Sequence, residues 1–259
     1  MKQTENHGKV SYVLVIGFFF LALLAHGNLL AEELPGQSDS SYQMEKTGQN
    51  QIVIAIDPGH PSETSGGCAH HGVTELQICW EVALRLEKMI DEEPSLRSIK
   101  TKPAVDTMVT NRQRAECANE AKAAIMVRLH CDSANGAGCT VYYPDKQGTT
   151  QGVTGPSEEV ISQSSLAAQC MQIGLAKVIG PYLKLNPVKT DSMTYVGSKQ
   201  GALTGSIFSK VPAIVVEMVY LNNASEAAFI QSFEGQDLLA RGMLAGIKEF
   251  LVSDQKTDF

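Results

Sequence analysis

The sequence lacks an excess of positive charge, and this absence argues against polyanions such as nucleic acid as ligands of the protein. It has 21 Lys and Arg residues against 28 Asp and Glu residues, which gives a formal net charge of −7 at pH 7. Binding to nucleic acid needs clustered cations that face the phosphates. We therefore expect no nucleic-acid partner, and no electrostatic capture of the protein by anionic polymers.

The sequence also lacks internal repeats and any second recognisable module. A hydrophobic fraction of 43% is typical of a folded chain, not of a disordered one. Roughly 50 residues at the N-terminus look non-globular, and the remaining ~210 residues suit one domain with a sizeable core. We place this domain at residues 52–252, followed by a short tail at 253–259.

Long apolar runs are scarce, but one stands near the N-terminus at residues 12–25, after Lys2 and Lys9. It is shorter than the ~20 residues that span a bilayer comfortably, and an extension to Leu30 would make a passable anchor. We therefore read residues 1–31 as a cleaved signal peptide or an uncleaved membrane anchor, and residues 32–51 as a polar linker. Both readings predict an extracytoplasmic domain.

The six cysteines of an exported chain could form up to three disulfides. Several of them, such as Cys117 and Cys170, occupy positions that look buried, where a free thiol packs as a small apolar residue. We expect mostly free thiols.

Apolar runs that end in polar residues mark the candidate site. The run 52–56 leads into Asp57-Pro58-Gly59-His60, the run 125–129 leads into His130, and the run 213–216 leads into Glu217. Buried strands of α/β proteins hold their ligands at the carboxyl edge of the sheet. Glu75 opens a helical segment, with Thr74 as its N-cap.

Catalytic zinc is commonly held by three protein ligands, such as two histidines and one carboxylate, and its fourth coordination position stays open for water or substrate. The sequence therefore predicts a zinc site formed by His60, Glu75 and His130, with Glu217 as general base. Each residue taken alone also fits a turn, a helix start or a strand end. His70 and His71 could compete as ligands, but their Gly-rich loop at 65–72 reads better as a flexible rim.

The predicted elements alternate between strands and helices. They comprise strands at 52–56, 125–129, 139–143 and 213–216, helices at 74–90, 112–123 and 158–182, an irregular stretch up to 203, and a loop beside the site at 144–157. Such alternation indicates an α/β fold: a single domain with a mixed, mostly parallel sheet and helices on both faces.

The chain resembles the zinc-dependent N-acetylmuramoyl-L-alanine amidases of the amidase-3 type, which cut bacterial peptidoglycan. Four ordered blocks carry the resemblance over about residues 50–252: Asp57-Pro58-Gly59-His60, Gly72-Val73-Thr74-Glu75, Arg114 to Asn119 ahead of His130, and Val211 to Glu226. The resemblance implies a six-stranded sheet. It also implies zinc held by His60, Glu75 and His130, catalysis by Glu217, and cleavage between N-acetylmuramic acid and L-alanine.

The chain departs from the family at positions that the ligand set does not use. Leu76, Cys79 and Cys131-Asp132 stand where the family usually has Lys, Asn and Ala-Asn, which puts substrate fit in doubt more than the reaction type. We expect a monomer that acts on peptidoglycan, with the N-terminal segment as a possible membrane anchor. The alternatives are a zinc peptidase acting on the stem peptide, and a wall-binding or regulatory module with little turnover.

Arg114 is a candidate for binding a substrate carboxylate, because a guanidinium group binds carboxylates in bidentate fashion. A structural salt bridge from its helix to the sheet is an equally good reading. Asn223 is the expected N-cap of the helix after the catalytic strand, and Glu226 its capping-box partner.

Overall fold

The computed structural model describes residues 51–254. The predicted signal peptide or anchor, nearly all of the linker and the end of the tail lie outside the described residues. Within the described part, no helix has both the length and the apolar character needed to cross a bilayer.

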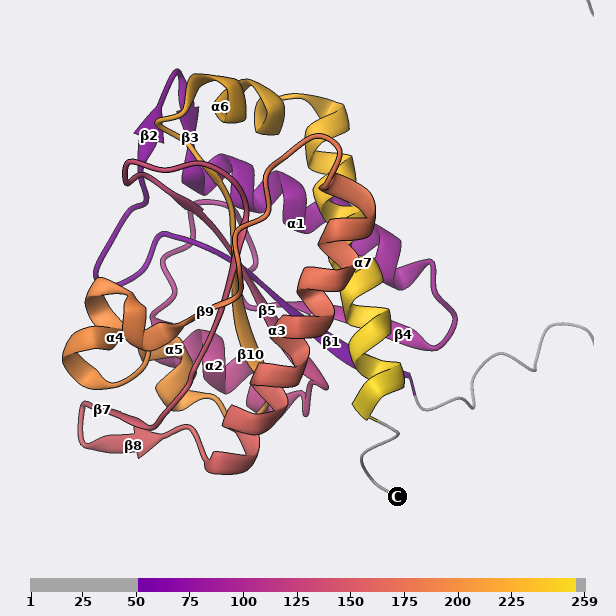
Figure 1. The fold of residues 1–259 in the computed structure, drawn as a ribbon. Coiled ribbons are helices and arrows are strands. Elements are labelled where there is room, and N and C mark those ends of the chain that lie inside the picture. Colours follow the sequence, from indigo (N-terminus) through magenta and orange to yellow (C-terminus); the bar gives the residue numbers. More distant parts are fainter. Residues whose placement is uncertain (1–50, 255–259) are drawn as a thin grey trace, which may run out of the picture. The chain divides into compact units, whose positions relative to one another are not determined.

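A six-stranded mixed sheet forms the centre of the domain (Figure 1). Its strands, in spatial order, are β4 (Leu96–Lys100), β1 (Ile52–Pro58), β5 (Ile125–Asp132), β10 (Ala213–Tyr220), β6 (Thr140–Tyr143) and β9 (Lys189–Thr190). Only the pairing of β10 with β6 is antiparallel. The predicted α/β domain with a mostly parallel six-stranded sheet is therefore confirmed.

Long helices cover one face of this sheet and short helices the other. The long ones are α1 (Glu75–Asp91), α3 (Glu158–Ile179) and α7 (Phe233–Asp254), which pack on one another and on the larger core (Figure 1). The opposite face carries α2 (Asn111–Glu120) and α5 (Thr204–Phe208) over a small core. The remaining elements are β2 (Ala69–His70), β3 (Val73–Thr74), β7 (Gly148–Thr150), β8 (Val153–Gly155), η1 (Asp191–Met193), α4 (Tyr195–Gln200) and α6 (Ala224–Gln231).

Strand β5 shows how the sequence assigns residues to these two faces. Val127 and Leu129 lie in the larger core, whereas Met126 lies in the small core under α2 and α5. Because side chains alternate along a strand, Arg128 and His130 also point toward the face of the short helices. Arg128 and His130 thus lie on the same side of the sheet.

Helix starts agree with the sequence prediction. The Thr74 side chain accepts a hydrogen bond from the backbone N–H of Gln77 and caps α1, so Glu75 is the first helical residue. Asn223 caps α6 through the backbone N–H groups of Ser225 and Glu226, as predicted. Glu226 itself does not close a capping box, because its carboxylate accepts hydrogen bonds from the N–H groups of Gly138 and Tyr220.

Several predicted boundaries and loops were wrong. The predicted loop at 144–157 contains the hairpin of β7 and β8, and the stretch up to 203 contains η1 and α4. Helix α3 ends at Ile179, and the rim loop at 65–72 includes strand β2. Backbone hydrogen bonds to a neighbouring strand stabilise β2, β7 and β8 although their apolar pattern is weak. No two of the six cysteines form a disulfide, as expected.

Candidate active site

A tight turn after β1 places His60 at the edge of the sheet. The backbone N–H of Gly59 donates to the carbonyl of Leu129 at 2.9 Å. A Cβ at Gly59 would lie 2.6 Å from that carbonyl oxygen and 2.8 Å from Cε1 of His130, so the close approach requires glycine. His60 itself takes the left-handed conformation with φ of 55°, which L residues adopt at a cost.

Two buried cations hold the carbonyl groups of this turn. The Arg114 guanidinium donates to the carbonyls of Pro58 at 2.6 Å and Pro61 at 2.8 Å. The Lys102 ammonium donates to the carbonyl of His60 and, at 2.9 Å, to that of Val105. Burial lowers the pKa of Lys102 to about 8. These bonds stabilise the strained conformation that directs the His60 ring to the edge of the sheet.

Asp57 is the counter-ion of two arginines. One carboxylate oxygen accepts from Arg114 at 2.7 Å, and the other accepts from Nε of Arg128 at 2.9 Å. Burial alone would raise the pKa of Asp57, but the two guanidinium groups outweigh it and hold the pKa well below its usual range. Arg114 is 1% exposed, and its salt bridge with Asp57 joins helix α2 to strand β1, so the structure supports the salt-bridge reading of this residue. Arg114 does not line the cleft that contains His60, His130 and Glu217.

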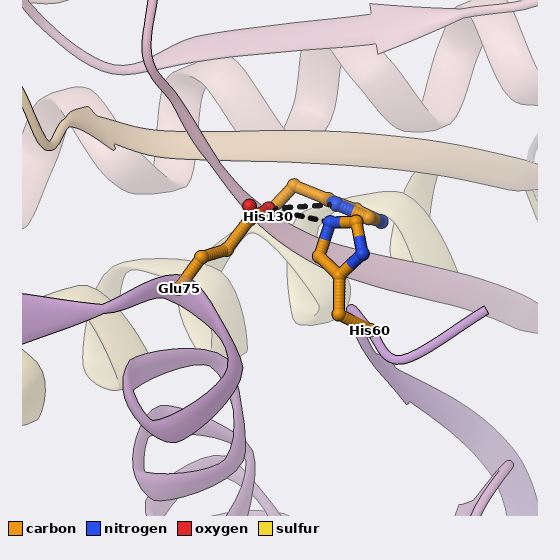
Figure 2. A group of neighbouring side chains, drawn as sticks. All are labelled: His60, Glu75 and His130. Atoms are coloured by element: carbon orange, nitrogen blue, oxygen red, sulfur yellow. Dashed lines mark hydrogen bonds and ion pairs between the residues drawn. The ribbon is translucent and has the colours of Figure 1, made fainter. Parts of the chain in front are cut away.

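Glu75 brings the two histidines together, as Figure 2 shows. Its Oε1 lies 3.0 Å from Nε2 of His60 and 3.0 Å from Nδ1 of His130, and it also accepts from the backbone N–H of Cys131 at 3.1 Å. The other carboxylate oxygen, Oε2, accepts from the N–H of Cys68 at 3.0 Å. Burial raises the pKa of Glu75, but the hydrogen bonds with His130 and His60 outweigh it, so the pKa is lowered.

The donor atoms of His60, Glu75 and His130 fit a zinc ion. All three donors lie within 4.8 Å of one another. Tetrahedral zinc, with bonds of about 2.0–2.1 Å, places neighbouring ligand atoms roughly 3.3 Å apart, and Oε1 of Glu75 lies 3.0 Å from each of the two imidazole nitrogens. Burial lowers the pKa of His130, which favours the neutral imidazole that binds a metal.

A further contact orients the His60 ring. Nδ1 of His60 lies 3.2 Å from the carbonyl oxygen of Ser65, which accepts a hydrogen bond from Nδ1–H when the proton is on this nitrogen. That tautomer leaves the lone pair on Nε2, the nitrogen that faces Glu75. His70 and His71 are not part of the group of three, and the ring of His71 instead contacts the carbonyl of Asn222 at 3.1 Å.

Glu217 lies beside this group on the neighbouring strand. It pairs in register with His130, and both residues line the same cleft. Oε2 of Glu217 is buried and has no hydrogen-bond partner among the described residues. Burial raises the pKa of Glu217 well above its ordinary value, and the charges of Glu75 and Asp132 raise it further. A buried carboxyl with an unpaired oxygen is what a proton acceptor for a bound substrate or water requires.

The cleft has a volume of about 420 Å³. Its walls come from the His60 turn, strands β5 and β10, helices α4 and α5, and the β7–β8 hairpin. A second hollow of about 460 Å³ lies between α2 and β8, but neither the three donors nor Glu217 line it. The predicted chemistry therefore belongs to the first cleft.

Sequence reasoning missed two cleft residues, Arg128 and Asn111. Both line the cleft, and Nη2 of Arg128 donates to Oδ1 of Asn111 at 2.8 Å. A signal for Arg128 was present, because a charged residue interrupts an apolar strand two positions before His130. Alternation along a strand places such a residue on the same face as the histidine.

A known protein family matches the sequence of this domain. The model of the N-acetylmuramoyl-L-alanine amidase family, amidase-3, matches residues 54–249. The chain belongs to this family. The resemblance inferred from the four sequence blocks is thereby confirmed.

Individual members of the amidase family are distant in sequence. The chain is 24% identical over 252 residues to the amidase AmiC of Escherichia coli O6:H1, which covers 86% of this chain and 58% of that protein. The amidase LytC of Bacillus subtilis is 25% identical over 76% of this chain and 36% of its own length. The chain thus spans little more than half of the first of these relatives and about a third of the other.

Solved amidase structures share the fold of the domain. The amidase AmiC2 of Nostoc punctiforme matches with a TM-score of 0.63 at 20% identity, over 79% of this chain and 99% of that chain. The catalytic domain of CwlV from Bacillus (Paenibacillus) polymyxa matches with a TM-score of 0.62 at 24% identity, over 78% and 99%. The described domain therefore has the fold of these two structures over nearly their whole length.

Proposed function

We propose that this domain hydrolyses the amide bond between N-acetylmuramic acid and L-alanine of the peptidoglycan stem peptide. The observation that carries the proposal is the meeting of His60, Glu75 and His130 beside Glu217 in one cleft of an amidase-family domain. Three donors suit a catalytic zinc site with an open position. We assign the zinc ligands to these three residues and the general base to Glu217.

When bound, zinc lowers the pKa of an attacking water and polarises the carbonyl of the scissile amide. Glu217 accepts the proton of that water and returns it to the leaving amine of L-alanine. Its unpaired Oε2 and its position opposite His130 in the sheet support this role. Arg114 and Lys102 are positioning residues, because their hydrogen bonds hold the turn that positions His60.

Mass spectrometry of digested, purified muropeptides tests this function. The expected products are stem peptides with a free N-terminal L-alanine, together with glycan that has lost its peptides. Cleavage inside the stem peptide would instead identify a zinc peptidase. Binding without either product, by a zinc-loaded protein, would identify a wall-binding or regulatory module.

We also propose that the domain works outside the cytoplasm, as a monomer. Peptidoglycan, the substrate proposed here, lies there, and the apolar run at 12–25 precedes the domain in the sequence. A reporter fused after Phe259 should be active only if it functions outside the cytoplasm. Activity of a cytoplasmic reporter at the same position would contradict this localisation, and the size of the mature chain distinguishes a cleaved signal from an anchor.

A further inference from the structure

Arg128 presents a positive charge at the floor of the catalytic cleft. It is 4% exposed and lines the cleft together with His130 and Glu217. Its position on β5, two residues before His130, directs it to the same face of the sheet. Arg128 is therefore placed to contact whatever part of the substrate extends along β5 from the reacting bond.

Two hydrogen bonds hold the guanidinium group in place. Nε donates to Asp57 at 2.9 Å, and Nη2 donates to Asn111 at 2.8 Å. Asn111 is itself oriented by Glu63, which accepts from its backbone and side-chain nitrogens at 2.9 and 3.2 Å. These bonds use Nε and Nη2 of Arg128, so Nη1 is the nitrogen that neither partner engages.

Gly205 of α5 makes room for this nitrogen. A Cβ at Gly205 would lie 2.7 Å from Nη1 and 2.7 Å from Cζ of Arg128. No side chain other than hydrogen fits there unless the guanidinium moves, and the bonds to Asp57 and Asn111 oppose such a movement. The position of Arg128 thus depends on the absence of a side chain in a cleft-lining helix.

Asp57 is the only carboxylate of the described residues that is hydrogen-bonded to Arg128. Asp57 supplies one carboxylate to two guanidinium groups, those of Arg114 and Arg128. Asp191 and Glu217 also lie close enough to interact with the charge of Arg128, but no hydrogen bond joins either of them to it in the described part of the chain. An anionic group of a ligand would complete the pairing at Arg128.

We propose that Arg128 binds a carboxylate of the stem peptide, the free α-carboxylate of its second residue. This inference rests on the proposed function. Where this second residue is a glutamate and the peptide continues through its side-chain carboxyl, the α-carboxylate is free unless it is amidated.

The spacing agrees with this assignment. Two extended residues separate the scissile carbonyl from the α-carboxylate, which is about 7 Å. Arg128 and His130 are also two residues apart along β5, which corresponds to about 6.6 Å between their Cα atoms. An amidase that uses Arg128 in this way prefers the acid form of the stem peptide to its amidated form.

Two muropeptides that differ only in this group, carboxylate or carboxamide, test the proposal. The wild-type, zinc-loaded protein should cleave the acid with a kcat/KM about tenfold higher or more, because a hydrogen bond to a charged group is worth roughly that factor. Arg128→Gln should bring the ratio close to one. Gly205→Ala should lower the ratio as well, although the charge of Arg128 is retained.

Arg114→Gln is the matched control. It breaks the other ion pair of Asp57 and disturbs the His60 turn, but Arg114 does not line the cleft. It should reduce cleavage of both substrates and leave their ratio as in the wild type. A wild-type ratio near one, or a ratio that Arg128→Gln and Gly205→Ala both leave unchanged, would overturn the proposal.

A binding experiment separates this inference from the proposed function. Calorimetric titration with the released peptides, acid and amide, measures the same preference without turnover. If the protein cleaves neither muropeptide but binds the acid peptide about tenfold more tightly, with Arg128→Gln removing the difference, the amidase function fails and the site at Arg128 stands. If it cleaves both equally and binds both equally, the amidase function stands and the site at Arg128 fails.

Discussion

Replacement of Glu217 by glutamine should stabilise the metal-free protein while it abolishes most of the activity. The two side chains have the same shape, but glutamine does not titrate. Burial and the charges of Glu75 and Asp132 raise the pKa of Glu217 well above its ordinary value. The folded wild type therefore holds a proton on Glu217 that the unfolded chain releases above about pH 4.5.

The size and sign of the effect follow from this difference. A raised pKa contributes stability that is fully present below the unfolded pKa and is lost as the pH rises through the folded pKa. Each pH unit between the two values costs the wild type about 1.4 kcal/mol. Relative to the wild type, the glutamine variant should thus gain about 1.4 kcal/mol for each pH unit between the unfolded and the folded pKa of Glu217. For a domain of this size each such unit corresponds to about 3–6 °C in Tm.

Thermal unfolding of both chelator-treated proteins at pH 5 and pH 7 measures this gain. Zinc should remove the difference, since a cation beside Glu217 favours its ionised form. The glutamine variant should keep its zinc and lose about 10²-fold or more in turnover on muropeptides. Glu75→Gln is the control, because it weakens a ligand and should lower zinc content together with activity. A stability difference that does not change with pH, or near-normal turnover of Glu217→Gln, would refute the reasoning.

Three further predictions concern the metal and the buried ion pairs. His60→Ala and His130→Ala should each lose zinc, as measured by elemental analysis, whereas His70→Ala and His71→Ala should keep it. Loss of zinc from the His70 or the His71 variant would show that the ligand assignment is wrong. Removal of zinc by a chelator should lower the free energy of unfolding by about 4 kcal/mol when free zinc had been 1,000-fold above its Kd, and an unchanged unfolding curve would argue against a bound metal. Asp57→Asn should cost about 3–5 kcal/mol in urea denaturation at pH 7, since it leaves two buried guanidinium groups without a counter-ion. The pKa of Asp57 is lower in the folded protein than in the unfolded chain, so its contribution to the free energy of unfolding is present above the unfolded pKa of about 3.9 and is lost as the pH falls through the folded pKa. The destabilisation by Asp57→Asn should therefore shrink in acid. A destabilisation that does not change with pH would contradict this account.

The sequence by itself determined the fold class, the family and the four residues of the candidate site. Each of these residues follows an apolar strand or begins an amphipathic helix, and such local patterns depend on neighbours in the chain. Because the carboxyl ends of parallel strands meet at one edge of a sheet, His60, His130 and Glu217 could be expected to converge there. Glu75 could be added because Thr74 is a recognisable helix cap.

Only the tertiary structure decided which arginine reaches the cleft. Both Arg114 and Arg128 bond to Asp57, but the sequence indicated only Arg114 as a substrate-binding candidate, with a structural salt bridge as an equally good reading. Strand pairing brings Arg128 to the cleft floor, whereas the carbonyls of the His60 turn occupy Arg114. The β7–β8 hairpin in the cleft wall was equally unpredictable. In each case the outcome depends on hydrogen bonds and charges between segments far apart in the chain, which a local pattern does not encode.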